Sequence, residues 1–478
     1  MTGLLILLLF SAMAGLLYAG RASALLALPA LALAVTIVAA GPAFYASAAG
    51  PLWHRLGSAS AQALHLAFAV VAAEGLPRLQ TAIFTVMLGG VFGQYLKLTG
   101  VAESLVRQVA ELGGDNPFLL ALLLTLCVSV LMTTLSGLGS VILLANIYFP
   151  VLLSLSVPPL LAASLFLLAS SLGGVFNLVN WSLYTDVLRI PVATLWRYAI
   201  PFGALNFLVL LAFMIVEFRR ARLAVAAATV ARALLAIAAL VAAAAGLRLG
   251  LAAHPGLWPW LSRAFVAAVI LLLAAPRVLP SGLLAPALPI GLVLVLGWPI
   301  NAAFLFGLIY LWRTAPRPPG KNLTKTLIQA TVEGLQHVSP AVGIMMGIGM
   351  LLVAVSQPVV SSAIEPLLRW ALPRTDAGYV VFFSLLAPLA LYRGPLNLWG
   401  LGSGLMSLIQ KTGMIGDVRV YAAFMSTGQI QGVCDPTNTH NVWIANQLKV
   451  DVQSILKLTL PYMWTLTIAG LLLGLHVR

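Results

Sequence analysis

Long apolar segments alternate with short polar ones along this chain. Runs such as 24–40, 118–132, 204–216 and 224–245 contain almost no charged residue. A helix of about 20 such residues crosses the hydrocarbon core of a bilayer. Polar backbone at that depth is tolerated only where it is buried in protein or lines a water-filled cavity. The pattern predicts an all-α polytopic membrane protein.

The composition agrees with this class, since 61% of the residues are hydrophobic and 8% are charged. The 26 basic residues exceed the 12 acidic ones, and several of the basic residues fall in short loops. Loop Lys and Arg set the orientation of membrane proteins, so the balance does not indicate a nucleic-acid partner. The two cysteines fit no disulfide framework and the six histidines have no metal-ligand spacing. We therefore expect that the protein is not an enzyme and has no cofactor. The exception is Na⁺, which one of the alternatives below includes.

Polar landmarks of the first half recur in the second half, in the same order and at an almost constant offset. Gly-Val-Phe-Asn-Leu-Val-Asn at 174–180 matches Gly-Val-Cys-Asp-Pro-Thr-Asn at 432–438, and Gly-Leu-Gly-Ser at 137–140 matches the same letters at 400–403. Further matched residues are Glu103 with Glu365, Arg107 with Arg369, and Pro201 with Pro461. Because chance similarity between apolar helices would not reproduce ordered polar landmarks, we predict an internal duplication.

The duplication divides the chain into a first repeat, residues 1–222, and a second repeat, residues 256–478. Residues 223–255 between them contain one long apolar run, which predicts a linker transmembrane helix. A single unpaired crossing inverts the second repeat when each repeat has an even number of crossings. Inverted repeats are a common architecture of secondary transporters.

Each repeat opens with apolar segments, continues with a less apolar helix, and then carries a membrane helix. The less apolar helix is expected at the membrane interface, over 60–76 and 324–337. The membrane helix is expected over 81–98 and 341–356. The stretch 283–312 is compatible with one crossing or with two.

Two interrupted segments follow in each repeat, at 133–140 and 173–186 and again at 393–403 and 428–446. A broken helix exposes N–H groups that favour anions and carbonyls that favour cations. Interruptions at corresponding positions of two halves indicate the binding site of a transporter. The predicted substrate-binding residues are Thr133, Thr134, Ser136, Gly137, Ser140, Asn177, Asn180, Arg393, Asn397, Trp399, Gly402, Ser403, Thr437, Asn438, Thr439 and Asn441.

Ionisable residues at the interruptions carry the sharpest chemical indications. The planar fork of Arg393 would match a carboxylate or phosphate, or else its side chain marks a helix end and reaches the headgroups. Asp435 and His440 are the candidates for the coupling ion: one of them carries a proton, or Asp435 and Asn438 hold Na⁺. Alternatively, Asp435 caps a broken helix and His440 is a buried structural residue. Asp186 is expected to form a local surface pair with the nearby arginine.

Together these features resemble the ion transporter superfamily, which contains lactate, gluconate, citrate and dicarboxylate permeases. The resemblance is carried by the two-fold repeat, the paired interruptions, and the polar stretches 133–140 and 432–441. It implies an elevator-type transporter that forms a homodimer. The implied scaffold part covers about 1–98 and 256–356, and the implied transport-site part about 99–222 and 357–478.

The sequence therefore predicts a secondary active transporter of a small organic anion, with a carboxylate as the expected class. Coupling to H⁺ or Na⁺ and a multi-pass location in the bacterial inner membrane belong to the same prediction. The alternative is a cation/proton antiporter of related repeat architecture. Arg393 and the scarcity of acidic residues in the apolar segments speak against that alternative.

Overall fold

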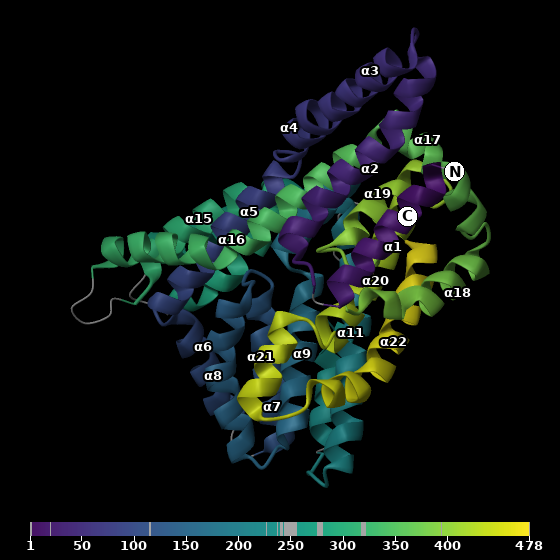
Figure 1. Ribbon diagram of the computed structural model, residues 1–478. Coiled ribbons are helices and arrows are strands. Elements are labelled where there is room, and N and C mark those ends of the chain that lie inside the picture. The colour runs from purple at the N-terminus through teal and green to yellow at the C-terminus, as the bar shows by residue number, and fades with distance from the viewer. Residues whose placement is uncertain are drawn as a thin grey trace.

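The structure is a computed structural model that describes residues 2–19, 21–113, 116–225, 227–236, 238–239, 242, 256–274, 281–316, 322–392 and 394–477. Every regular element among these residues is a helix, so the predicted all-α class is confirmed (Figure 1). Seven described helices are long and apolar enough to cross a membrane. The number rises to eight when α9 (Pro159–Val175) and α10 (Leu178–Leu188), which are bent by 49° at their junction, count as one span.

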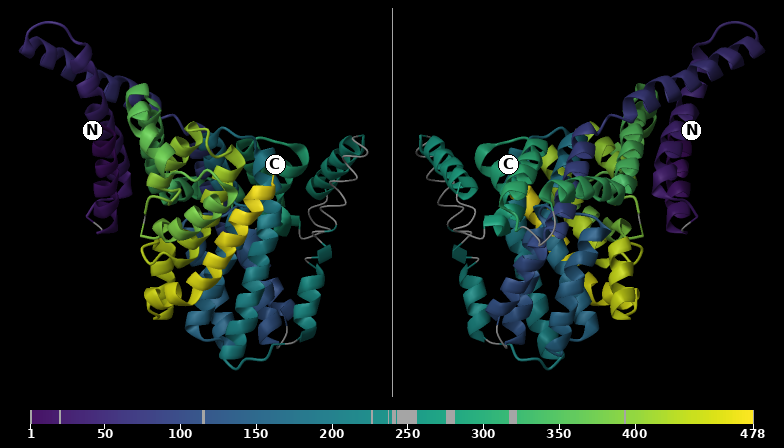
Figure 2. Two further views of the ribbon diagram at one scale, coloured as in Figure 1. Left: turned by 90° about the vertical axis from the view of Figure 1, so that its right-hand side faces the viewer. Right: turned by 90° about the vertical axis from the view of Figure 1, so that its left-hand side faces the viewer.

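The first half opens with two apolar helices and a long helical rod, Leu52–Gly75. The rod extends away from the helical body, on the side of the molecule where the N-terminal helix lies (Figure 2). It begins at Leu52, earlier than the helix predicted over 60–76, and Leu52–Gly75 is itself apolar enough to cross a membrane. The elements are α1 (Thr2–Tyr18), α2 (Ala24–Ser47), and the rod of α3 (Leu52–His65), the π-helical η1 (Leu66–Ala72) and α4 (Ala73–Gly75).

The two halves meet along α16 (Leu323–Ser356), which packs against α2 and against α5 (Gln80–Leu98). Glycines make these crossings close. A Cβ on Gly334 would lie 2.8 Å from the carbonyl oxygen of Gly90, and a Cβ on Gly349 would lie 2.2 Å from the carbonyl oxygen of Gly75. Because no side chain fits at these points, the helix backbones pack in direct contact.

Helix α16 corrects one sequence prediction. Two helices were expected over 324–337 and 341–356, but α16 is a single helix of 34 residues that continues through Pro340. Proline lacks the N–H that would normally bond the carbonyl four residues earlier, here that of Gln336. The Ser339 hydroxyl donates to that carbonyl at 2.9 Å, so the acceptor is satisfied and the helix continues.

The second half opens with shorter pieces. The stretch 283–312 contains two helices that are separated at Gly297, whose φ of +65° suits glycine. Part of the predicted linker helix is described, as an apolar helix over Ala227–Ala236, and the rest of that prediction lies outside the described residues. The elements are α13 (Leu257–Ala274), the 3₁₀ segment η2 (Ser281–Ala287), α14 (Leu288–Leu296) and α15 (Ile300–Thr314).

Matched positions of the two halves share local geometry. Glu103 and Arg107 form an ion pair of 2.6 Å on α6 (Val101–Gly113), and Glu365 and Arg369 form one of 2.7 Å on α17 (Pro358–Ala371). The helices that close the halves, α11 (Val192–Arg220) and α22 (Val452–His476), pack against each other, and each contains a proline.

Candidate functional site

Each half contains two interrupted helix pairs, near the predicted positions. The non-helical intervals are shorter than 173–186 and 428–446, because polar residues of those stretches lie on the helices and cap them. The first half has α7 (Pro117–Met132) with α8 (Leu138–Ser154), and α9 with α10. The second half has α18 (Asp376–Leu386) and η3 (Ala387–Ala390) with α19 (Leu401–Lys411), and α20 (Asp417–Cys434) with α21 (Thr439–Leu448).

Asn177 joins the two interruptions of the first half. Its Nδ2 donates to the carbonyls of Met132 at 2.7 Å and Leu135 at 3.0 Å, between α7 and α8. Its Oδ1 accepts from the backbone N–H groups of Val179 at 3.0 Å and Asn180 at 3.2 Å, which caps α10. This buried amide therefore satisfies backbone groups of both breaks, as buried polar groups require.

Asp435 occupies the matched position of the second half and is fully buried. Its Oδ1 accepts from the backbone N–H of Thr437 at 2.9 Å and from the Thr437 hydroxyl at 2.7 Å. These contacts hold the turn that follows α20 and favour the capping interpretation of Asp435. Its role with a coupling ion stays a prediction.

Asn180 and Asn438 repeat one contact in the two halves. Asn180 Nδ2 donates to the carbonyl of Gly174 at 3.2 Å, and Asn438 Nδ2 approaches that of Gly432 at 3.5 Å, each six residues earlier in the chain. The two halves also meet here, because Trp399 Nε1 donates to Asn180 Oδ1 at 3.3 Å.

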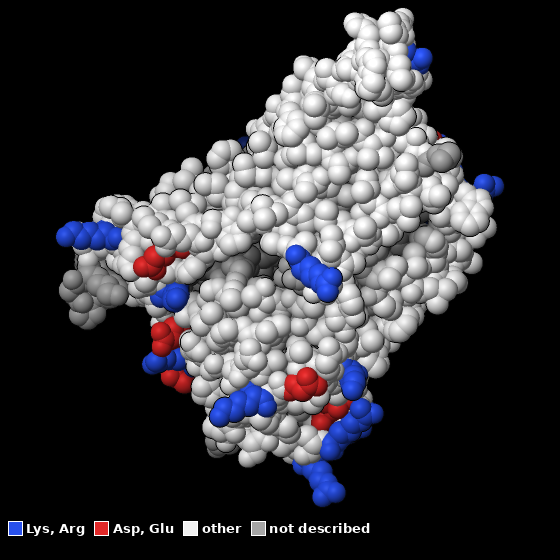
Figure 3. All heavy atoms as spheres, viewed as in Figure 1, with Lys and Arg blue, Asp and Glu red and all other residues white. Residues whose placement is uncertain are grey.

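A cavity of about 370 Å³ lies among the interruptions. The space-filling view shows this face hollowed between α16 and α21, with most of its Lys, Arg, Asp and Glu side chains near the edges (Figure 3). The predicted site residues that line the cavity are Ser136, Gly137, Asn177, Asn180, Trp399, Asn438 and His440.

The other described site residues lie at the interruptions but outside the cavity lining: Thr133, Thr134, Ser140, Asn397, Gly402, Ser403, Asp435, Thr437, Thr439 and Asn441. Most of them bond to nearby backbone instead. The Thr133 hydroxyl donates to the Val130 carbonyl at 2.7 Å, and the Ser403 hydroxyl donates to the Gly400 carbonyl at 2.9 Å. They shape the turns around the cavity. Arg393 lies outside the described residues.

The list of predicted site residues lacks several polar residues that line the cavity: Ser170, Ser171, Tyr184, His337, Gln429 and Gln431. Ser171 donates to Gln429 Oε1 at 2.7 Å and accepts from Asn206 Nδ2 at 3.0 Å. These two hydrogen bonds hold the Gln429 amide in place. The two glutamines belong to the polar stretch 428–446, so that signal was present. His337 carried no signal, because it stood at the end of a helix expected at the membrane interface.

Asp186 corrects the predicted surface pair. Its Oδ2 accepts from the backbone N–H of Ala82 at 2.9 Å, in the first turn of α5, where the helix dipole favours a carboxylate. Arg78 and Arg189 lie nearby. Burial, followed by the positive charge of Arg189, lowers the pKa of Arg78, and the negative charge of Asp186 opposes this lowering. The carboxylate thus links α10 to α5.

The cavity lining combines apolar side chains with uncharged polar ones among the described residues. None of its described lining residues is Asp, Glu, Lys or Arg. The helices α8, α10 and α21 begin at or beside lining residues, so their N-terminal ends contribute partial positive charge. Within the described part of the chain, no group of three or more His, Cys, Asp or Glu residues could hold a metal ion.

No family model and no curated protein matches the sequence. Among solved structures, the fold is similar to the crystal structure of the YdaH transporter of Alcanivorax borkumensis, whose topology is described as unusual. The TM-score is 0.57 and the sequence identity 16%, over 93% of this chain and 96% of that chain. At this identity the likeness concerns the fold: the chain has the fold of a polytopic membrane transporter. The ion transporter superfamily is not singled out by this match and stays a prediction.

Proposed function

We propose that this protein is a secondary active transporter of a small organic anion, with a carboxylate as the expected substrate class. The observation that carries the proposal is the cavity between the helix interruptions of both halves. Its amides, hydroxyls and helix N-termini are donors that suit carboxylate oxygens. Such a site on a transporter fold supports binding inside the membrane, between two access routes.

In this proposal, transport is coupled to H⁺ or Na⁺ and proceeds by alternating access with an elevator-like motion. The close glycine crossings of α2, α4 and α5 with α16 suit a rigid scaffold. The interrupted helices would form the moving part. Two inverted repeats, a homodimer and a bacterial inner membrane complete the proposal, and the shared geometry of matched residues supports the repeats.

A cation/proton antiporter has less support. A cation path needs carboxylates in the membrane, and the described cavity lining contains none. Asp435, the acidic residue at the α20–α21 break, is fully buried beside the turn it holds.

Thermal stabilisation of the purified protein tests the proposal. Lactate, gluconate, citrate, succinate and inorganic salts are added separately, with and without Na⁺. A ligand that binds only the folded protein at about 100 times its Kd stabilises it by about 2.7 kcal/mol. We expect a rise in Tm with at least one carboxylate. Shifts with inorganic cations alone would contradict the proposal and favour the antiporter.

Arg393→Ala provides a second test, because sequence places this guanidinium at an interruption. The variant is expected to lose the stabilisation by the carboxylate that shifts the wild-type protein, since the charge-assisted bidentate contact is gone. Arg107→Ala is the matched control, because Arg107 pairs with Glu103 on α6 and does not line the cavity. A carboxylate shift that is the same in Arg393→Ala and wild type would remove Arg393 from the site.

A further inference from the structure

Two histidines stand out among the described residues that line the cavity, none of which is Asp, Glu, Lys or Arg. Histidine is the side chain whose ordinary titration falls between about pH 5 and 8. Among the described lining residues, His337 and His440 are the ones of this type, and they lie on different elements, α16 and α21. A proton that enters the cavity in this pH range therefore has two places to bind.

His337 lies where α16 changes character. The 34 residues of α16 extend over about 50 Å at about 1.5 Å per residue, which exceeds the roughly 30 Å hydrocarbon core. Its first half is polar and carries Lys325 and Glu333, whereas residues 338–356 contain no charged residue. His337 is the last titratable residue before the apolar half. It is exposed on the protein surface and also lines the cavity.

An ordered carboxylate lies one turn before His337. Glu333 accepts a hydrogen bond from Gln94 Nε2 of α5 and another from Gln329 Nε2 at 2.7 Å. Lys97 of α5 and His337 are the charged or titratable neighbours of this carboxylate. The carboxylate therefore lies beside the cavity histidine of α16.

His337 also contacts the first turn of α8. A Cβ on Gly139, in the first turn of α8, would lie 3.4 Å from His337 Nδ1, so the ring covers that glycine. Neither α8 nor α2 contains Asp, Glu, Lys, Arg or His. Within the cavity the other titratable groups are His440 of α21 and Tyr184 of α10.

His440 is in a different situation. It is half-buried in the first turn of α21, and no described cavity residue offers it a carboxylate. Burying a charge without a partner is costly, so the imidazolium is favoured only when an anion lies beside it. Anion binding and protonation of this ring then promote each other, which is the thermodynamic requirement for coupling.

We propose that His337 and His440 form a two-step proton path that couples anion transport to H⁺. His337 takes a proton from water at the cavity mouth and passes it, through water in the cavity, to His440. His337 then returns to its neutral form. His440 carries the proton with the bound anion and releases it to water on the other side. This inference rests on the proposed transport function and selects H⁺ over Na⁺.

Uptake into proteoliposomes tests the path. Radiolabelled lactate, gluconate, succinate and citrate are supplied with either an inward pH gradient or an inward Na⁺ gradient. At one proton per anion, and with the membrane potential clamped, a one-unit pH gradient supports about tenfold accumulation. We expect pH-driven accumulation in the wild type and a fall of about tenfold or more in its initial rate in His337→Gln. His65→Gln on α3 is the matched control with the wild-type rate.

Glu333→Gln gives a second, independent readout. With the carboxylate charge removed, the imidazolium that the path forms at His337 loses its neighbouring negative charge, so the rate of pH-driven uptake is expected to fall while the added carboxylate still raises Tm. Glu103→Gln on α6 should keep the wild-type rate. This pair of measurements decides the matter if His337→Gln does not fold, as judged by gel filtration and Tm.

The outcomes separate the two levels of inference. No accumulation of any carboxylate under either gradient in a folded wild-type protein overturns the proposed function. Accumulation driven by Na⁺ alone overturns only the proton path. Wild-type pH-driven rates in His337→Gln or in Glu333→Gln also overturn the proton path while leaving anion transport standing.

Discussion

Polar residues at the interruptions have two separate tasks. Some, such as Asn177 and Asp435, satisfy backbone groups that the broken helices leave open. Others, such as Gln429 and His440, present polar atoms to the cavity. Residue type alone does not separate the two groups, because an amide suits a carbonyl of the protein as well as a substrate.

Asn177→Ala tests the first task. The change removes two donors to carbonyls and the cap of α10 at a position with 5% of its surface exposed. We expect the free energy of unfolding to fall by about 2–4 kcal/mol. Asn180→Ala is the control: its side chain is half-buried with longer contacts of 3.2 and 3.3 Å, so its cost should be about 1 kcal/mol. Equal Tm losses in detergent would contradict the anchoring role.

At the scale of elements, the positions of the helix interruptions could be predicted from the sequence, but the residues at which the neighbouring helices begin and end could not. Gly137 and the Asp435-Pro436 step are local signals, and they mark real ends of helices. The polar residues after Asn177 and Asn438 were taken for irregular backbone, although the caps let helices begin immediately. The break expected between 324–337 and 341–356 was wrong in the opposite sense, because the Ser339 hydroxyl satisfies the carbonyl that Pro340 leaves without its helical partner.

The cavity lining was only partly predictable for a related reason. Which side of α16 or α20 faces the breaks depends on packing between helices that are far apart in sequence, such as α5 with α16. Gln429 lay in a recognised polar stretch, but its partners Ser171 and Asn206 lie on α9 and α11. His337 lies on the continuous helix α16, three residues before Pro340, and lines the cavity.

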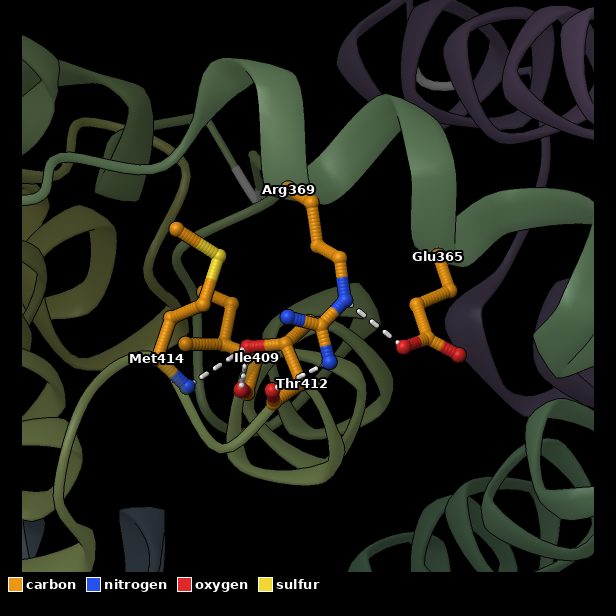
Figure 4. A network of polar contacts seen from close by, with 5 residues as sticks. All are labelled: Glu365, Arg369, Ile409, Thr412 and Met414. Atoms are coloured by element: carbon orange, nitrogen blue, oxygen red, sulfur yellow. Dashed lines mark hydrogen bonds and ion pairs between the residues drawn. The ribbon is translucent and has the colours of Figure 1, made fainter.

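The ion pair on α17 differs from its counterpart on α6. Arg369 pairs with Glu365 and also donates to the Thr412 carbonyl at 3.0 Å, just after α19 (Figure 4). The Thr412 hydroxyl in turn donates to the Ile409 carbonyl at 2.7 Å and accepts from the Met414 N–H at 3.3 Å. The guanidinium therefore connects α17 to the end of an interrupted helix, where a cation is favoured.

Arg369→Ala tests this connection. Its guanidinium is half-exposed, so we expect a loss of about 1 kcal/mol in the free energy of unfolding. Arg107→Ala removes only an exposed pair within α6 and should cost about 0.3–0.5 kcal/mol. Chemical unfolding of both variants measures the difference. A larger loss in Arg107→Ala would show that the contact to Thr412 adds nothing.

At the scale of the whole molecule, the packing falls into two kinds. Along α16 the helices pack closely at glycines, and Gly334 and Gly349 meet the backbones of α5 and α4 directly. Between α5 and α10 the contacts are made by side chains and by the single carboxylate of Asp186. An elevator-like motion would change the second kind and preserve the first.

Engineered disulfides distinguish the two kinds of contact. A Cβ on Gly89 of α5 would lie 3.4 Å from Val179 Cγ2 of α10, and a Cβ on Gly343 of α16 would lie 3.7 Å from Leu25 Cγ of α2. A cysteine sulfur occupies the γ position, so both pairs are within reach of a bond. Oxidation of Gly89→Cys/Val179→Cys should stop carboxylate uptake until a reductant is added, because α10 is then fixed to α5.

Leu25→Cys/Gly343→Cys is the matched lock, since it joins two helices of the proposed scaffold. Its oxidation should leave the uptake rate unchanged, and loss of thiol labelling verifies bond formation in both proteins. The native Cys127 and Cys434 are buried and lie on different helices, so they do not compete for these bonds. Continued uptake with α5 and α10 cross-linked would rule out movement between them, and inhibition by the α2–α16 lock would show that the scaffold itself must rearrange.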